Sequence, residues 1–209
     1  MHRGFTVCVL FLAISNQVAA QDSLLGSRPA RDSSPFRPGQ WATQFGAGSN
    51  LVSLGFLAFT TSHRAWLIDV RVNGGHSHSE FRTTGDSSAN EEVTSDFSIG
   101  PRLGLRFYRV RNAEIAGFES VGLSGGYVHS CRWSSFLAFS ACSNGWSAGV
   151  FGELGGAYLL TPHLSIGATS SLAFTYQRTT GRDSRSGRSS FWSYSGGFQG
   201  LSLLTTLYF

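Results

Sequence analysis

Apolar and polar residues alternate along most of this chain. Between residues 65 and 78, apolar residues occupy every second position, with Asp69 and Arg71 between them: Trp66, Ile68, Val70 and Val72. Successive side chains of a β-strand point to opposite faces of the sheet, so this period of two predicts a strand with one apolar and one charged face. The same alternation recurs in later segments and predicts an all-β chain.

Eight segments carry this pattern and are separated by turn-forming residues. They are residues 41–48, 51–61, 65–78, about 97–107, 116–129, 146–160, 164–177 and 191–209. The connections between them alternate in length. The short ones are residues 62–64, 109–114 and 161–163, and the long ones are residues 82–92, 130–145 and 178–190; the Ser49–Asn50 turn is a short exception. Short turns on one side and long loops on the other are typical of an up-and-down barrel that spans a membrane.

The charged face of these strands distinguishes a membrane barrel from a soluble sandwich. In a sandwich the apolar faces would pack on a second sheet, whereas in a transmembrane barrel they face lipid and the charged faces line the lumen. We therefore predict an eight-stranded antiparallel transmembrane β-barrel with charges inside. The residues expected to form this lumen ion-pair network are Asp69, Arg71, Arg102, Arg106 and Glu153.

The register of the fifth strand is less clear. Glu119 shares a face with Val121 and Leu123, so this carboxylate falls on the apolar side of the strand. We expect it to lie at the periplasmic rim, where water reaches it.

The N-terminus carries an export signal. Residues 1–20 combine His2 and Arg3, an apolar run and small residues at Ala19 and Ala20, which together predict a cleaved signal peptide. Residues 21–39 are rich in Pro, Ser and Arg and are expected to be a disordered periplasmic tail. The barrel is expected to occupy residues 40–209.

Composition agrees with this interpretation and excludes one class of function. The chain has 26 Gly, 17 Phe and only 13% charged residues, which favours strands and turns over helices. The net charge of +4 is modest, and the arginines do not form a basic stripe, so nucleic-acid binding is not expected. No cofactor and no metal site are predicted.

The C-terminal stretch "LSLLTTLYF" ends the chain on an aromatic residue. Leu203, Leu207 and Phe209 resemble the C-terminal signature by which the barrel assembly machinery recognises its substrates. With the eight strands, this makes residues 41–209 similar to the small eight-stranded outer-membrane β-barrels of the OmpA, OmpX and OmpW type. The resemblance implies a monomeric outer-membrane protein in contact with lipid and lipopolysaccharide.

The lumen of such a barrel is only wide enough to be filled by side chains. Its opposite charges can form a static ion-pair core, which offsets the cost of removing charge from water. They can also act as a salt-bridge gate that changes partners to admit ions. The sequence leaves both possibilities open.

The predicted outer loops hold two further features. Cys131 and Cys142 are the only cysteines after the signal peptide, and an exported chain meets oxidising conditions, so a disulfide within the third outer loop is expected. The fourth outer loop carries four arginines that suit lipopolysaccharide phosphates, because guanidinium groups bind phosphate bidentately. These are Arg178, Arg182, Arg185 and Arg188.

Catalysis has weaker support. His163 and Ser165 faintly resemble the His-x-Ser pair of lipid A deacylases, but they fall in a periplasmic turn. His76 and His78 share a face with Glu80 at the outer end of the third strand, which makes an acid/base site conceivable. We therefore predict a non-enzymatic barrel that acts in envelope integrity or surface interaction. A narrow gated channel is the alternative, and a lipid A-modifying enzyme is the third.

Overall fold

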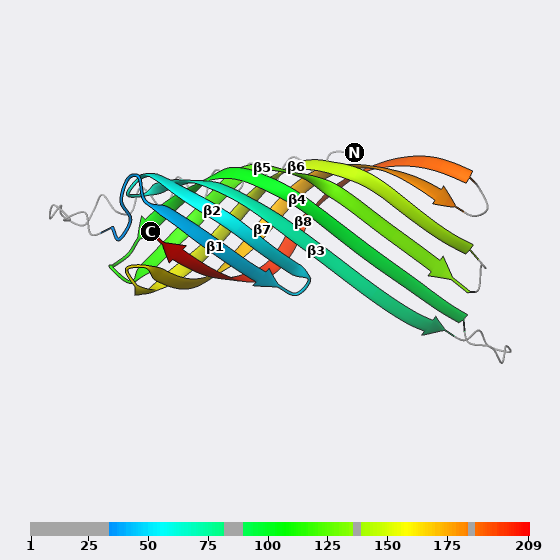
Figure 1. Cartoon of the computed structure of the whole chain (residues 1–209), viewed down its shortest axis with the longest axis horizontal. Coiled ribbons are helices and arrows are strands. Elements are labelled where there is room, and N and C mark those ends of the chain that lie inside the picture. Colours follow the sequence, from blue (N-terminus) through cyan, green and yellow to red (C-terminus); the bar gives the residue numbers. More distant parts are fainter. Residues whose placement is uncertain (1–33, 82–89, 136–138, 184–186) are drawn as a thin grey trace, which may run out of the picture. The chain divides into compact units, whose positions relative to one another are not determined.

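The computed structural model describes residues 34–81, 90–135, 139–183 and 187–209 and forms a closed antiparallel barrel of eight strands in sequential order (Figure 1). This confirms the predicted fold. Among the described residues, no helix is long and apolar enough to cross a membrane. The strands are β1 (Trp41–Gly48), β2 (Leu51–Thr61), β3 (Arg64–Phe81), β4 (Asn90–Val110), β5 (Ile115–Ser134), β6 (Phe139–Thr161), β7 (Leu164–Asp183) and β8 (Gly187–Tyr208).

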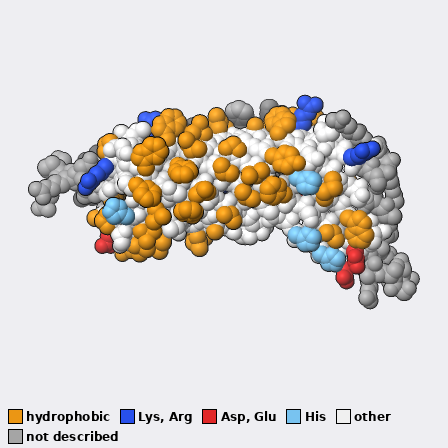
Figure 2. Space-filling model, viewed as in Figure 1, with side chains coloured by type: hydrophobic (Ala, Val, Ile, Leu, Met, Phe, Trp, Pro, Cys, Tyr) orange, Lys and Arg blue, Asp and Glu red, His pale blue; other side chains and the backbone are white. Residues whose placement is uncertain are grey.

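The period of two places apolar side chains outside and polar ones inside. Ile68 and Val70 are 54% and 42% exposed, whereas Asp69 between them is only 2% exposed. Figure 2 shows hydrophobic side chains spread over the middle of the barrel surface, with charged side chains towards its two ends. Exposed apolar surface of this extent is stable only in contact with lipid.

Aromatic side chains mark the outer border of this apolar band. Trp146, Tyr176 and Tyr194 lie on the outside of three neighbouring strands, β6, β7 and β8. The ring centroids of Trp146 and Tyr176 are 5.4 Å apart, and those of Tyr176 and Tyr194 are 5.2 Å apart. We call Trp146, Tyr176 and Tyr194 the outer aromatic belt. Aromatic residues gather at the level of the lipid headgroups, so we place the extracellular border of the membrane at this belt.

The periplasmic turns and the Ser49–Asn50 turn agree with prediction, but two of the long outer loops do not, and most of the predicted loop at residues 82–92 lies outside the described residues. β2 ends at Thr61 and β3 begins at Arg64, as the short connection predicted. The predicted loops at residues 130–145 and 178–190 are instead mostly strand, because β5 continues to Ser134, β6 begins at Phe139 and β7 continues to Asp183. Outside the membrane neither face must be apolar, so the alternation is lost while the backbone hydrogen bonds continue.

The first hairpin is much shorter than the others (Figure 1). β1 ends at Gly48, which lies opposite Ser202 of β8, and β2 begins at Leu51 opposite Asn73 of β3. Beyond these points the described parts of β8 and β3 have register partners only on β7 and β4. Tyr194 lies eight residues nearer the outer end of β8 than Ser202, which corresponds to roughly 26 Å along the strand and about 20 Å along the axis of a tilted barrel. The hairpin therefore ends below the outer aromatic belt and leaves a notch in the barrel wall.

The N-terminal boundary needs a correction. The predicted disordered tail ended at residue 39, but residues 34–39 lie on the barrel, and the earlier part of the tail and the signal peptide fall outside the described residues. Ser34 donates a hydrogen bond to the carbonyl of Ser62 (2.7 Å), and the Phe36 ring is 2% exposed. The composition of the tail did not predict the burial of Phe36, because one phenylalanine hardly changes the average polarity of a segment.

Candidate functional site

The five charged residues predicted to face the lumen lie together in its middle. Asp69 and Arg102 lie directly opposite each other on β3 and β4, which makes their pairing a direct result of strand register. Arg102 Nε donates to Asp69 Oδ1 at 2.7 Å, and Arg102 Nη2 donates to Asp69 Oδ2. This bidentate geometry is the strongest form of a guanidinium–carboxylate pair.

Glu153 on β6 joins the remaining charges. Its Oε1 accepts hydrogen bonds from Arg71 and, at 2.7 Å, from Arg102, and its Oε2 accepts one from Arg106 at 3.1 Å. The carboxylate therefore contacts three guanidinium groups from β3 and β4. We call the five residues the lumen charge cluster: Asp69, Arg71, Arg102, Arg106 and Glu153.

Neutral groups complete the hydrogen bonding of Arg106. Its Nε donates to Ser120 Oγ at 2.9 Å, and its Nη1 donates to Gln44 Oε1. The guanidinium also lies 4.1 Å from the ring centroid of Phe118, and that of Arg102 lies 4.3 Å from the ring of Phe151. Burial of a charge is tolerated when its hydrogen bonds are satisfied in this way.

Gln44 also belongs to this site, although the sequence pattern alone did not predict it. Gln44 is 3% exposed and lies on the same face of β1 as Ala42 and Gly46. Its alternation with Trp41 and Phe45 places it inside the barrel, but a single uncharged amide does not by itself indicate an ion-pair site.

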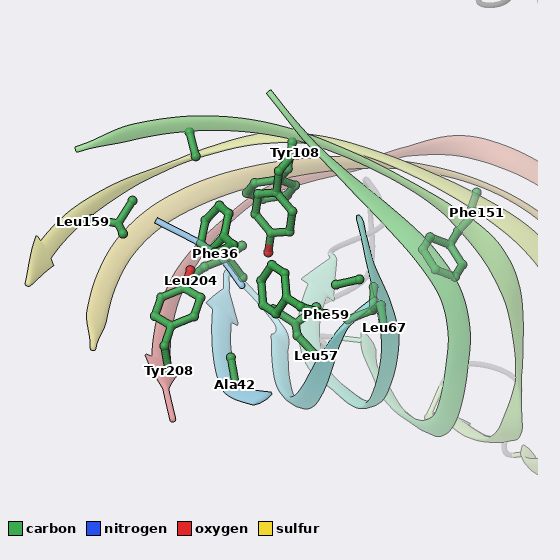
Figure 3. Packing of buried hydrophobic residues seen from close by; sticks show 14 residues of the cluster. Phe36, Ala42, Leu57, Phe59, Leu67, Tyr108, Phe151, Leu159, Leu204 and Tyr208 are labelled. Carbon is green, nitrogen blue, oxygen red and sulfur yellow. The ribbon is translucent and has the colours of Figure 1, made fainter. Parts of the chain in front are cut away.

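Buried hydrophobic side chains from several strands pack together inside the barrel (Figure 3). Five rings among them form an aromatic core between the lumen charge cluster and the periplasmic end: Phe36, Phe59, Tyr108, Phe118 and Tyr208. The Phe36 ring centroid lies 4.5 Å from that of Tyr108 and 5.5 Å from that of Tyr208, and Phe59 stacks on Phe36 at 4.8 Å. The Tyr208 hydroxyl is hydrogen-bonded to Ser165 at 3.0 Å. Together the rings and the ion pairs close the inner half of the barrel.

The outer half of the lumen is hollow, so the predicted filling stops at the lumen charge cluster. A cavity of about 280 Å³ lies above it, with Arg71, Arg102 and Phe151 among its lining residues. A second cavity of about 220 Å³ lies at the Ser49–Asn50 turn, beneath the notch, and both cavities are lined by Asn73. We call the larger one the outer cavity.

The disulfide joins Cys131 and Cys142, which lie opposite each other on β5 and β6. It was predicted within a loop, but it links two strands where they extend beyond the outer aromatic belt. Around it, His129 contacts both Cys131 Sγ (3.3 Å) and Asn144 Oδ1. The cross-link therefore fastens the β5–β6 hairpin outside the membrane.

Reduction of this disulfide should destabilise the protein measurably. For cysteines 11 residues apart the loop-entropy model gives about 3 kcal/mol, and the paired strands around the bond make this an upper limit. We expect the double variant Cys131→Ser/Cys142→Ser and the reduced wild type to lose the same free energy of unfolding in urea titrations. Equal midpoints for oxidised and reduced wild type would contradict this expectation.

The other predicted residues lie on the outside of the barrel. Arg178 and Arg182 are exposed on β7, two and six residues beyond Tyr176 of the outer aromatic belt, so they belong to a strand and not to a loop. Arg185 and the side chain of Arg188 lie outside the described residues. Leu203, Leu207 and Phe209 are 66%, 39% and 73% exposed at the periplasmic end of β8, and their role as an assembly signal stays a prediction.

The histidines do not gather into an enclosed site among the described residues. His76 contacts Ser95 at 2.9 Å and His78 contacts Glu80 at 3.4 Å, and both pairs are exposed on the outer part of β3 and β4. His163 contacts the Tyr208 carbonyl at 3.1 Å in a periplasmic turn, and Ser165 bonds the Tyr208 hydroxyl instead of His163. The two side chains of the faint His-x-Ser resemblance thus have separate partners.

Comparison with known proteins rests on structure. No family model and no curated protein matches the sequence. A major outer membrane protein from Thermus thermophilus is similar in structure, with a TM-score of 0.54, 10% identity and coverage of 81% of this chain and 98% of that one. OprG from Pseudomonas aeruginosa has a TM-score of 0.47 and 11% identity over 83% and 97% of the two chains. Outer membrane protein AlkL has a TM-score of 0.43 and 15% identity over 89% and 97%.

At such identities the likeness to the Thermus protein shows the fold, which the strand order and the apolar exterior show independently. This chain has the fold of a small eight-stranded outer-membrane β-barrel.

Proposed function

We propose that this protein is a monomeric, non-conducting outer-membrane barrel that acts at the cell surface. The observation that carries the proposal is the closed inner half of the lumen. Arg106 and Glu153 are 1% and 3% exposed and fully engaged with each other and their neighbours, and the Phe36 ring fills the space below them. A passage for ions would require both layers to open.

The outer side offers more opportunity for function than the inner one. β3 to β8 continue beyond the outer aromatic belt, and the Cys131–Cys142 bond fastens two of them. Arg178 faces outwards just above the belt, where lipopolysaccharide phosphates lie in an outer membrane, and Arg182 lies four residues farther out on the same face of β7. We therefore place envelope and surface interactions on these strand extensions, with lipopolysaccharide as the lipid partner.

Single-channel recording of the refolded protein in planar bilayers tests the proposal. We expect no discrete conductance steps from the wild type, and none from Arg102→Ala, because the aromatic core still closes the barrel below the altered cluster. A heat-modifiable band on gels provides the control for folding.

A different outcome would support the narrow gated channel. Discrete steps from the wild type, with an amplitude that changes in Arg102→Ala, would mean that the lumen charge cluster conducts and gates. Such steps would overturn the non-conducting proposal.

A further inference from the structure

The lumen charge cluster is not neutral. Arg71, Arg102 and Arg106 contribute three positive charges, and Asp69 and Glu153 contribute two negative ones, so the buried cluster carries one net positive charge. An unbalanced charge in a region of low dielectric attracts a counter-ion much more strongly than it would in water.

The excess charge is accessible from one side only. Arg71 is the most exposed member of the cluster, with 13% of its side chain accessible, and it lines the outer cavity together with Arg102. On the other side, Arg106 is covered by the aromatic core. An anion can therefore approach the cluster from the outer cavity and not from the periplasm.

The cavity walls supply hydrogen-bond donors above this cationic floor. The polar side chains that line it are Asn73, Ser98, Ser124, Ser147, Thr175, Gln177 and Ser195. Hydroxyl and amide groups of this kind bind both an oxyanion and the hydroxyl groups of a sugar. A few polar groups that converge on one charged group are typical of small-ligand sites.

Small inward residues keep the space open. Gly100 and Gly126 face each other across β4 and β5 in the cavity wall. A Cβ atom on Gly100 would lie 1.9 Å from the carbonyl oxygen of Gly125, so no larger residue fits between these strands. Both glycines line the outer cavity without a side chain, which leaves room in the lumen at this level.

We propose that the outer cavity is a binding site for a phosphate or carboxylate group, held by Arg71 and Arg102 and by the surrounding hydroxyl groups. This goes beyond the proposed function and does not depend on it, because a conducting barrel would keep the same site. Asp96 is the negative group on the cavity side of β4 nearest to the proposed site, six residues from Arg102, roughly 20 Å along the strand. At this distance water and salt screen it from the site.

Two sources of the anion fit this chemistry. A soluble sugar phosphate can enter through the outer mouth of the barrel. The phosphate of a lipid headgroup can enter through the notch above the first hairpin, because the small cavity at Ser49–Asn50 and the outer cavity are both lined by Asn73.

The test is a calorimetric titration of the full barrel, refolded in a nonionic detergent, with glucose 6-phosphate, orthophosphate and glucose as probes. We expect both phosphates to bind, glucose to bind at least tenfold more weakly than glucose 6-phosphate, and added salt to weaken the phosphates. Arg71→Gln should reduce phosphate affinity at least tenfold. Arg109→Gln removes the same charge from an exposed pair with Glu119 and should change nothing.

Two further variants distinguish the loss of the binding site from a loss of folding. Arg71→Lys keeps the charge and should retain binding within a few fold. Thr175→Asp adds a negative charge to the cavity wall without touching the lumen charge cluster, and it should abolish binding while the heat-modifiable band persists. The proposal would be overturned if the wild type did not bind phosphate, or if Arg71→Gln and Thr175→Asp bound phosphate as tightly as the wild type.

Lipid vesicles identify the source of the anion. If the wild type binds glucose 6-phosphate more weakly in phosphatidylglycerol vesicles than in detergent, the lipid headgroup competes for the site. If the sugar phosphate binds equally well in these vesicles and in detergent, the ligand is soluble. Either result supports an anion site. Binding is measured independently of conductance, so channel activity would overturn the proposed function without affecting the anion site.

Discussion

Glu153→Gln should lower the free energy of unfolding by about 3–5 kcal/mol, the range for removal of one partner from a buried ion pair. The substitution keeps the shape of the side chain and removes its charge. It leaves Arg71, Arg102 and Arg106 with Asp69 as their only remaining carboxylate within the lumen charge cluster. Urea unfolding in lipid vesicles, followed by tryptophan fluorescence, measures the loss.

The chain supplies a matched control for this experiment. Glu119 pairs with Arg109 at 3.3 Å on the exterior, and 37% of its side chain is exposed. Glu119→Gln should cost less than about 1 kcal/mol, because exposed ion pairs contribute little. Similar losses for the two variants would contradict a special role for the buried cluster.

A second substitution should restore part of the loss. Arg71→Gln in the Glu153→Gln background returns the net charge of the cluster to that of the wild type. We expect the double variant to be more stable than Glu153→Gln alone, since the two side chains interact directly and their effects are not additive. Simple addition of the two single losses would mean that charge balance does not govern the stability of the cluster.

Phe36→Ala should also destabilise the barrel by about 3–5 kcal/mol, the usual range for truncation of a buried aromatic residue. The Phe36 ring is 2% exposed and packs between Phe59, Tyr108 and Tyr208. Its removal leaves a cavity that these aromatic rings cannot close, because each is attached to a different strand. The same urea titration measures the effect.

Arg37→Ala is the control for this variant. Arg37 is the next residue in the same segment and its side chain is exposed, while its backbone N–H, which the substitution keeps, bonds Gln40 Oε1 at 3.1 Å. We expect a change of less than about 0.5 kcal/mol. If Phe36→Ala were equally harmless, residues 34–39 would be a tail that merely touches the barrel, as their composition suggested.

Local sequence patterns were sufficient for the strands inside the membrane. The alternation of Ile68 and Val70 with Asp69 and Arg71 is enforced by lipid on one side and the lumen on the other. The pattern fails where this constraint ends. From Cys131 to Ser134 the strand β5 continues in water, where no face must be apolar, and the sequence there was interpreted as a loop.

The sequence by itself determined that this chain is an eight-stranded barrel with an apolar exterior and charges inside, because period-two alternation is a local property. Only the tertiary structure decided which charges meet. Asp69 finds Arg102 on the adjacent strand, but Glu153 reaches Arg71 across 82 residues, a pairing set by closure of the whole ring. The inward turn of Phe36 and the hollow above Arg71 likewise depend on contacts among strands distant in sequence, which no local pattern records.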